Sequence, residues 1–347
     1  MYYIKQLELT KRKPNGYKLT ECSNKSGLQR FLAKHGYDVE LGVLLKGGID
    51  SSVYSAIFNK RKIIIKHTED RANSIYFPPF SEIDFYVDRK NQNVDSLVLK
   101  KLKGTSIRVP SLIKYFPETS TALMEDLRES GFVLMLDQII DGNLKEKTAE
   151  CLGDKLAELI LLSRKWKSFK CYKNPRSQIF ERGLELRLAF PNTQVEYKKL
   201  ESRFLNNSKN WLWPDAHPKN IFVNNESGEV AFIDFGGSYW GDQEFLLPNF
   251  IGQLIIYVIC GYIDIEFSEK YINKILIAYK KKIPINEELF CKYVGMEILH
   301  RSMGKWIQGV ETTDNKVKNI NVGISIFDGN INTFVSLFDL IRSVVKY

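Results

Sequence analysis

Two short motifs decide the fold that the sequence predicts: Asp215-Ala216-His217-Pro218-Lys219-Asn220 and, further along the chain, Ile233-Asp234-Phe235-Gly236. Between them lie two apolar runs, residues 221–224 and 230–233, separated by a polar stretch that contains a glycine. This pattern is typical of a β-hairpin. Because a hairpin returns the chain to its starting point, we expect the two motifs to meet at neighbouring strand ends.

The polar residues of the two motifs form the set that phosphoryl transfer needs. A carboxylate orients an attacking hydroxyl and accepts its proton, and oxygen ligands hold Mg²⁺ against the phosphates. The sequence offers one Asp, an Asn five residues later and a second Asp beyond the hairpin. We therefore predict that Asp215 is the catalytic residue and that Asn220 and Asp234 are the metal ligands.

The combination Asp-x-His-Pro-x-Asn, hairpin, Ile-Asp-Phe-Gly resembles the aminoglycoside phosphotransferase and choline kinase family of protein-kinase-like small-molecule kinases. Ile-Asp-Phe-Gly alone is a commonplace turn, but the pair at this separation is specific. The resemblance covers about residues 28–345. It implies an α+β, two-lobed protein-kinase-like fold, with ATP and Mg²⁺ bound between a small β-rich lobe and a larger helical lobe. It also implies a hydroxyl of a small molecule as the acceptor.

The first third of the chain is predicted to form strands over residues 41–45, 53–58 and 62–66, after a short helix over residues 28–35. A glycine-containing loop, Lys46-Gly47-Gly48-Ile49-Asp50-Ser51-Ser52, joins the first two strands. Small residues let backbone N–H groups approach phosphates closely. With the resemblance, this predicts that Gly47, Gly48 and Ser51 bind the phosphates of ATP.

Lys66 ends the third strand, where the family has its phosphate-positioning lysine. The resemblance implies that its ammonium pairs with the α- and β-phosphates. Kinases of this type pair that lysine with a Glu on the following helix, and Asp95 is the best-matching position, near the start of a helix over residues 94–102. Because Asp is one methylene shorter, Asp95 is either the ion-pair partner of Lys66 or a helix N-cap.

The segment Leu123-Met124-Glu125-Asp126-Leu127 follows the last predicted strand, which ends within residues 121–127. It resembles the hinge between the lobes of the family, so Glu125 and Leu127 are predicted to lie where the backbone contacts adenine. His217 stands where protein kinases have a lysine that contacts the γ-phosphate. We predict that His217 lies near the nucleotide, and the His favours a small-molecule acceptor over a protein.

Long helical patterns dominate the rest of the chain, over residues 147–166, 197–205, 245–262, 267–281, 287–307 and 330–346. The predicted division is residues 1–124 as the N-lobe, with the glycine loop and the lysine, and residues 125–347 as the C-lobe. The second part would hold the hinge, the catalytic loop and the metal site.

Two positions depart from the family pattern. Trp213 replaces a His two residues before Asp215, and Leu246 replaces an Asp four residues after Asp242. Both family residues brace backbone, so the departures affect local geometry more than chemistry. They leave open an inactive nucleotide-binding scaffold, and a protein kinase is a further alternative, disfavoured by His217 and by the absence of an Ala-Pro-Glu motif.

Composition excludes several other classes. The 347 residues include 50 Lys and Arg against 41 Asp and Glu, a net charge of +9, but the basic residues are scattered and no nucleic-acid-binding motif occurs. The 5 cysteines are widely spaced, which favours reduced thiols and a cytoplasmic protein. No run is apolar enough for a signal peptide or membrane span. We expect neither a nucleic-acid partner nor a membrane, and the oligomeric state stays open.

The acceptor's charge has two alternatives. Four arginines lie in or beside the segment where the family builds part of its acceptor pocket: Arg176, Arg182, Arg187 and Arg203. Facing the pocket, they would favour a neutral or anionic acceptor, because guanidinium groups bind oxyanions in pairs of hydrogen bonds. In the second alternative, glutamates that interleave with these arginines pair with them along one helix face, and the arginines bind no ligand. The sequence leaves both alternatives open.

Overall fold

The computed structural model describes residues 25–45, 51–68, 90–171, 194–207, 210–303, 312–327 and 331–345. The chain divides into two compact units: unit 1 is residues 1–105 with 109–131, and unit 2 is residues 106–108 with 132–347. What the predicted lobes, residues 1–124 and 125–347, each do stays a prediction.

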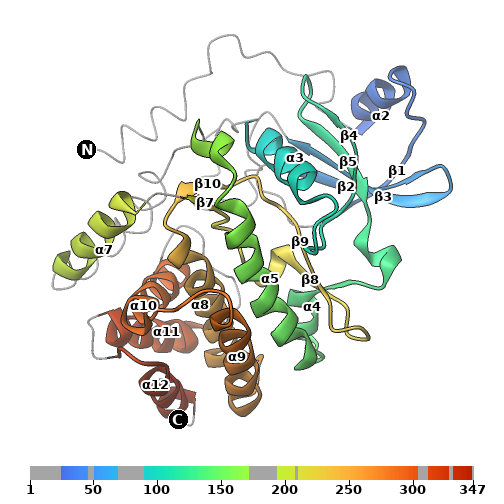
Figure 1. The fold of residues 1–347 in the computed structure, drawn as a ribbon. Helices are drawn as coiled ribbons and strands as arrows, with labels where there is room; N and C mark the ends of the chain where they lie inside the picture. The colour runs from blue at the N-terminus through green and yellow to red at the C-terminus, as the bar shows by residue number, and fades with distance from the viewer. Residues whose placement is uncertain are drawn as a thin grey trace. The chain divides into compact units, whose positions relative to one another are not determined.

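Unit 1 contains a five-stranded antiparallel sheet in the order β1-β2-β3-β5-β4 (Figure 1). The strands are β1 (Glu40–Leu45), β2 (Ser51–Phe58), β3 (Arg61–Thr68), β4 (Leu112–Phe116) and β5 (Thr121–Glu125). Two helices, α2 (Lys25–Lys34) and α3 (Lys90–Leu102), accompany the sheet, and the 3-10 helix η2 (Leu127–Ser130) follows β5. The predicted first hairpin is confirmed, since β1 and β2 pair antiparallel.

The two faces of this sheet have different partners. Ile63 and Ile65 of β3 belong to an apolar core with Leu28 and Phe31 of α2. Side chains alternate along a strand, so Lys66 points to the opposite face. There it meets α3, and the sheet therefore lies between the two helices.

Unit 2 combines two small sheets with a set of helices. One sheet has the order β6-β8-β9, from Val133–Leu134, Ile221–Val223 and Val230–Phe232, and the other pairs β7 (Asn210–Leu212) with β10 (Tyr239–Gly241). The helices are α4 (Met135–Ile140), α5 (Lys147–Ser163), α7 (Gln194–Asn206), α8 (Leu246–Ile259), α9 (Ile265–Lys280), α10 (Glu287–Met303), α11 (Thr313–Phe327) and α12 (Phe334–Val345). Short 3-10 helices η3 (Lys167–Cys171), η5 (Pro218–Asn220) and η6 (Gln243–Phe245) connect them.

Helix α8 is the most apolar of these elements, and all of its residues are buried. The prediction of a buried helix over this stretch is confirmed, and its interior polar residues face protein. Within the part of the chain that the structure describes, we find no helix with the length and hydropathy needed to cross a membrane.

Most predicted elements are present, with shifted ends. The strand predicted over residues 121–127 stops at Glu125, because Asp126 leaves the sheet and caps η2 by accepting a hydrogen bond from the Arg128 amide. Strands β4, β6, β7 and β10, the short helix α4 and helix α11 were not predicted. In β4 and α4 the run of apolar residues is too short for its periodicity to distinguish a strand from a helix.

The backbones of helices α5 and α9 approach so closely at Gly153 that no side chain fits between them. A Cβ built on Gly153 would overlap the Ile275 carbonyl oxygen and lie 2.9 Å from the carbonyl carbon of the same residue. Both helices therefore depend on the missing side chain at this position.

We predict that Gly153→Ala lowers the free energy of unfolding by about 1–3 kcal/mol, the usual range for overpacking a core. In an uncrowded helix interior the same change stabilises by about 1 kcal/mol, so the sign is diagnostic. Urea denaturation of the two proteins measures it, and a more stable variant would show that α5 and α9 are not in this contact.

Candidate active site

The β8–β9 hairpin brings the two sequence motifs together. Ile221 pairs with Phe232, and the Ile233 amide donates a hydrogen bond to the Asn220 carbonyl at 3.0 Å. Asn220 therefore lies beside the start of the Ile-Asp-Phe-Gly turn. The first motif therefore ends where β8 begins and the second begins where β9 ends, so both lie at the same end of the β8–β9 hairpin, as the pattern of apolar runs predicts.

Asp215 joins this edge through two contacts. The side-chain amide of Asn220 donates to the Asp215 backbone carbonyl at 3.0 Å. The Asp215 carboxylate lies so near Gly237 that a Cβ there would overlap its Oδ2 atom. The structure thus assembles Asp215, Asn220 and Asp234 around the hairpin.

Asp234 has an unusual backbone conformation, with φ of 59°, in the left-handed region. Non-glycine residues rarely adopt it, and such strain is concentrated at functional sites. The indole N–H of Trp213 donates to the Asp234 carbonyl at 2.9 Å. Trp213, expected to contribute only bulk, therefore also supplies a hydrogen bond.

His217 is held in its neutral form. Burial, aided by the positive charges of Arg301 and Lys219, lowers its pKa to about 3. Its Nε2 lies 3.3 Å from the Asn220 amide nitrogen, a donor, so Nε2 accepts and the single ring proton is on Nδ1. That Nδ1 is buried without a hydrogen-bond partner among the described residues, which leaves one donor available to a ligand.

The loop that carries Asp215 is braced by a residue that the sequence did not predict. The amide of Asn249, in α8, donates to the carbonyls of Pro214 at 2.7 Å and Ala216 at 3.2 Å, and the side chain is fully buried. Leu246, at the position of the family's bracing Asp, is simply buried. The available signal was an Asn inside the apolar stretch of α8, since a buried amide requires partners.

One turn further along α8, a second buried polar cluster was also missed. Gln253 donates to the Glu297 carboxylate at 3.1 Å, and Arg301 pairs with that carboxylate at 2.7 Å. Glu297 is fully buried. Its charge is compensated by this arginine, as a buried carboxylate requires.

Two further carboxylates near the motifs are already engaged. Asp242 accepts hydrogen bonds from the Tyr293 hydroxyl at 3.0 Å and from the Glu244 amide at 3.1 Å. Burial raises the pKa of Asp242. Glu244 pairs with Arg203 at 2.9 Å. These contacts hold the turn before α8 and make both carboxylates poor candidates for metal ligands.

In unit 1, Lys66 and Asp95 form an ion pair with 3.1 Å between Nζ and Oδ2. Their side chains are only 12% and 3% exposed. Of the two alternatives for Asp95, the ion-pair partner is therefore the one observed, and Asp95 lies inside α3, where no N-cap can be. Whether this pair binds phosphates stays a prediction.

The remaining predicted nucleotide residues also lie in unit 1. Val53 is the register partner of Lys66, so Ser51, two residues earlier, lies on the same face of the sheet as Lys66. Gly47 and Gly48 lie outside the described residues.

The proposed hinge residues have internal partners. Glu125 accepts hydrogen bonds from the Ser111 amide at 3.1 Å and the Ser130 hydroxyl at 3.2 Å. Leu127 is buried at the start of η2. The Glu125 carboxylate thus stabilises the turn after β5, and adenine contacts would come from the backbone.

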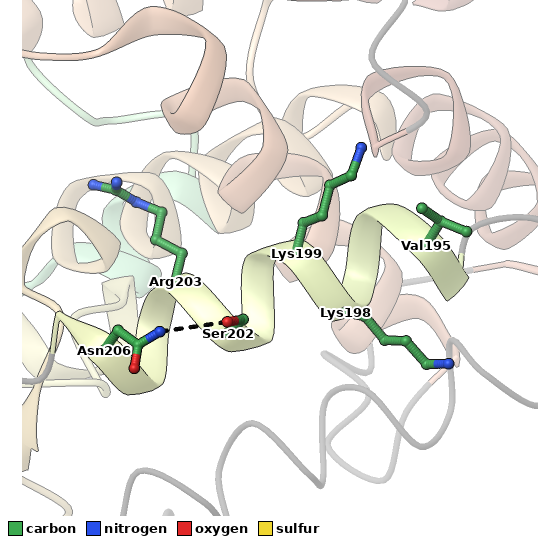
Figure 2. A pocket seen from close by; sticks show the side chains of 6 residues that line it. All are labelled: Val195, Lys198, Lys199, Ser202, Arg203 and Asn206. Carbon is green, nitrogen blue, oxygen red and sulfur yellow. Dashed lines mark hydrogen bonds between the residues drawn. The ribbon is translucent and has the colours of Figure 1, made fainter.

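An open groove of about 610 Å³ runs along α7 (Figure 2), and its lining includes none of Asp215, Asn220 and Asp234. Its lining residues are Val195, Lys198, Lys199, Ser202, Arg203 and Asn206. Arg203 pairs with Glu244, and Lys199 pairs with Glu196 at 2.6 Å. Arg203 therefore has a carboxylate partner, but that partner lies in the turn before α8 and not on the helix face of Arg203, as the self-paired alternative requires. Arg176, Arg182 and Arg187 lie outside the described residues.

The donor set fits a divalent metal that retains other ligands. The side-chain nitrogen of Asn220 donates to the Asp215 carbonyl, so the side-chain oxygen of Asn220 is the end that suits a cation. Over the described ranges, no three His, Cys, Asp or Glu side chains gather closely enough to hold a metal by themselves. Mg²⁺ typically takes one or two protein oxygens and completes its shell with water and phosphate.

By sequence, no family model matches this chain and no curated protein matches it. Solved structures match over most of its length. An amicoumacin kinase in complex with AMP-PNP and Ca²⁺ is 13% identical, with a TM-score of 0.55, over 88% of this chain and 95% of that chain. The choline kinase LicA from Streptococcus pneumoniae is 15% identical, with a TM-score of 0.51, over 88% and 98%.

A protein of Ralstonia eutropha assigned as an aminoglycoside phosphotransferase is 12% identical, with a TM-score of 0.53, over 92% of this chain and 98% of that chain. This chain has their protein-kinase-like fold. The predicted α+β class and the predicted resemblance are confirmed at the level of fold. At such identities the protein-kinase-like fold is what the similarity shows, and activity has to be argued from the site.

We predict that Asn249→Leu lowers the free energy of unfolding by about 2 kcal/mol, because the buried carbonyls of Pro214 and Ala216 lose a donor. The nearly isosteric Asn249→Asp should destabilise further, since its carboxylate repels both carbonyls. Chemical denaturation at neutral pH measures both changes. A leucine variant as stable as the parent protein would mean that the amide does not brace the loop.

Proposed function

We propose that this protein is an ATP- and Mg²⁺-dependent phosphotransferase that moves the γ-phosphate of ATP to a hydroxyl of a small molecule. The observation that carries the proposal is the hydrogen bonding of Asn220 to Asp215 and, across the β8–β9 hairpin, to Ile233, the residue before Asp234. The Lys66–Asp95 ion pair on the sheet of unit 1 supports it independently.

Asp215 would orient the acceptor hydroxyl and take its proton as the oxygen attacks the γ-phosphorus. The bond from that phosphorus to the bridging oxygen of the β-phosphate breaks, and ADP leaves with the bonding electrons. The Asp215 carbonyl accepts a hydrogen bond from Asn220, and the Asp215 carboxylate lies against Gly237. The base would therefore be held in place before the acceptor arrives. Such positioning is the main contribution a protein makes to this reaction.

The other groups would hold the nucleotide. Lys66 would pair with the α- and β-phosphates, with Gly47, Gly48 and Ser51 near them. His217 would offer its Nδ1 proton to a phosphate oxygen, as its unpartnered donor suggests. Asn220 and Asp234 would hold Mg²⁺, which when bound neutralises the charge that develops on the phosphates.

Two alternatives are tested in one experiment. The departures at Trp213 and Leu246 motivate an inactive nucleotide-binding scaffold, and the fold itself accommodates a protein kinase. Stabilisation by Mg²⁺-ATP is measured by thermal shift, and ATP turnover is measured with sugars, nucleosides, amino alcohols, antibiotics and a protein substrate. Binding without turnover would favour the scaffold, and phosphorylation of protein alone would favour the protein kinase.

We predict that Asp215→Asn reduces kcat by at least about two orders of magnitude, because the amide cannot accept the hydroxyl proton. Nucleotide affinity should stay within about twofold, since Asp215 faces the acceptor. Turnover and nucleotide titration on the same preparation separate the two effects. A variant that keeps most of its turnover would remove Asp215 from the mechanism.

We predict that Asp234→Ala weakens Mg²⁺-dependent binding of ATP, because it removes an anionic oxygen ligand from a cation that prefers such ligands. The thermal shift produced by Mg²⁺-ATP over ATP alone measures this. Glu244→Ala is the matched control, since Glu244 is engaged by Arg203 and should leave the Mg²⁺ effect unchanged. If Glu244→Ala lost the Mg²⁺ effect and Asp234→Ala kept it, the metal would be assigned to the turn before α8.

A further inference from the structure

We propose that Trp213 is a positioning residue whose indole N–H holds the Asp234 turn in its left-handed conformation and thereby sets the affinity for Mg²⁺. This rests on the proposed function, because it assumes that Asp234 is a metal ligand. Trp213 itself touches neither substrate nor metal in this account.

The strained backbone at Asp234 requires something to hold it. A φ of 59° brings the Asp234 side chain and its carbonyl into an arrangement that an unrestrained chain rarely adopts. Strain of this kind persists only when the surrounding structure over-determines it. The hydrogen bond of 2.9 Å from Trp213 fixes the direction of the carbonyl, and so of the peptide that follows Asp234.

Packing fixes the indole that makes this bond. Trp213 is fully buried, and its ring lies 5.0 Å from Phe235 and 5.3 Å from Phe232 between centroids. These residues flank Asp234 in sequence on both sides. The indole therefore touches the turn before and after the strained residue and donates to its centre.

A neighbouring tryptophan provides the matched control. Trp211, in β7, is also buried, and its ring also packs against Phe235, with 6.1 Å between ring centroids. Its Nε1 has no hydrogen-bond partner among the described residues. Replacing either indole by a phenyl ring removes similar packing, but only the change at residue 213 removes a donor to Asp234.

The test compares Trp213→Phe with Trp211→Phe by calorimetric titration of Mg²⁺ into protein saturated with a non-hydrolysable ATP analogue. We expect Mg²⁺ affinity to fall about tenfold in Trp213→Phe, as loss of one buried hydrogen bond implies, and to change less than about twofold in Trp211→Phe. Excess Mg²⁺ should restore kcat in Trp213→Phe, because the Asp215 loop keeps its Asn249 brace. If Trp213→Phe does not fold, 3-benzothienylalanine at position 213 replaces only the N–H by sulfur.

Three outcomes overturn the inference. In the first, Mg²⁺ affinity is unchanged when the indole N–H of Trp213 is removed but falls in Asp234→Ala. This result would leave the proposed function intact and would show that Trp213 does not position the metal ligand. Equal losses in the two Phe variants would assign the effect to packing alone. Unchanged Mg²⁺ affinity in Asp234→Ala would remove both the metal assignment and the role of Trp213.

Discussion

The hydrogen bond from the Ile233 amide to the Asn220 carbonyl closes the β8–β9 hairpin, and the candidate site in unit 2 depends on that closure. It places Asn220, the last residue of the first motif, beside Ile233, the first residue of the second motif. From there, the Asn220 amide reaches the Asp215 carbonyl, and the Asp215 carboxylate meets the backbone just beyond Asp234. A slip of one residue in this register would turn each of these side chains to the other face.

Buried polar side chains supply the rest of the rigidity. Asn249 reaches from α8 to two carbonyls of the catalytic loop, and Trp213 reaches from the end of β7 to the carbonyl of Asp234. Each donor sits in an apolar environment, where an unmade hydrogen bond is expensive, so the loops have few alternative conformations. The substitutions that distinguish this chain from the family pattern thus change how the loops are held, and Asp215, Asn220 and Asp234 are all present.

The fold and the proximity of the two motifs were predictable because they depend on local patterns. Short runs rich in β-branched and aromatic residues predicted strands of unit 1, and the apolar runs between the two motifs predicted the hairpin that brings Asp215, Asn220 and Asp234 to one place. The bracing residues were not predictable in this way, because Asn249 and Glu297 act across helices that are distant in sequence. The hydrogen bond of Trp213 was missed for a related reason. The sequence shows a large apolar side chain that can pack, but it does not show which carbonyl the indole N–H meets. Strand β5 ends early because the Asp126 cap outweighs the apolar pattern.

In the proposed function, the groups around the hairpin and the Lys66–Asp95 pair would act on one nucleotide. A structure determined with Mg²⁺ and a non-hydrolysable ATP analogue tests it most directly. The account predicts that the Asn220 side-chain oxygen and the Asp234 carboxylate ligate the metal, that Lys66 contacts the α- and β-phosphates, and that the γ-phosphate faces Asp215. A metal held by Asp242 or Glu244, or a nucleotide bound away from Lys66, would contradict it.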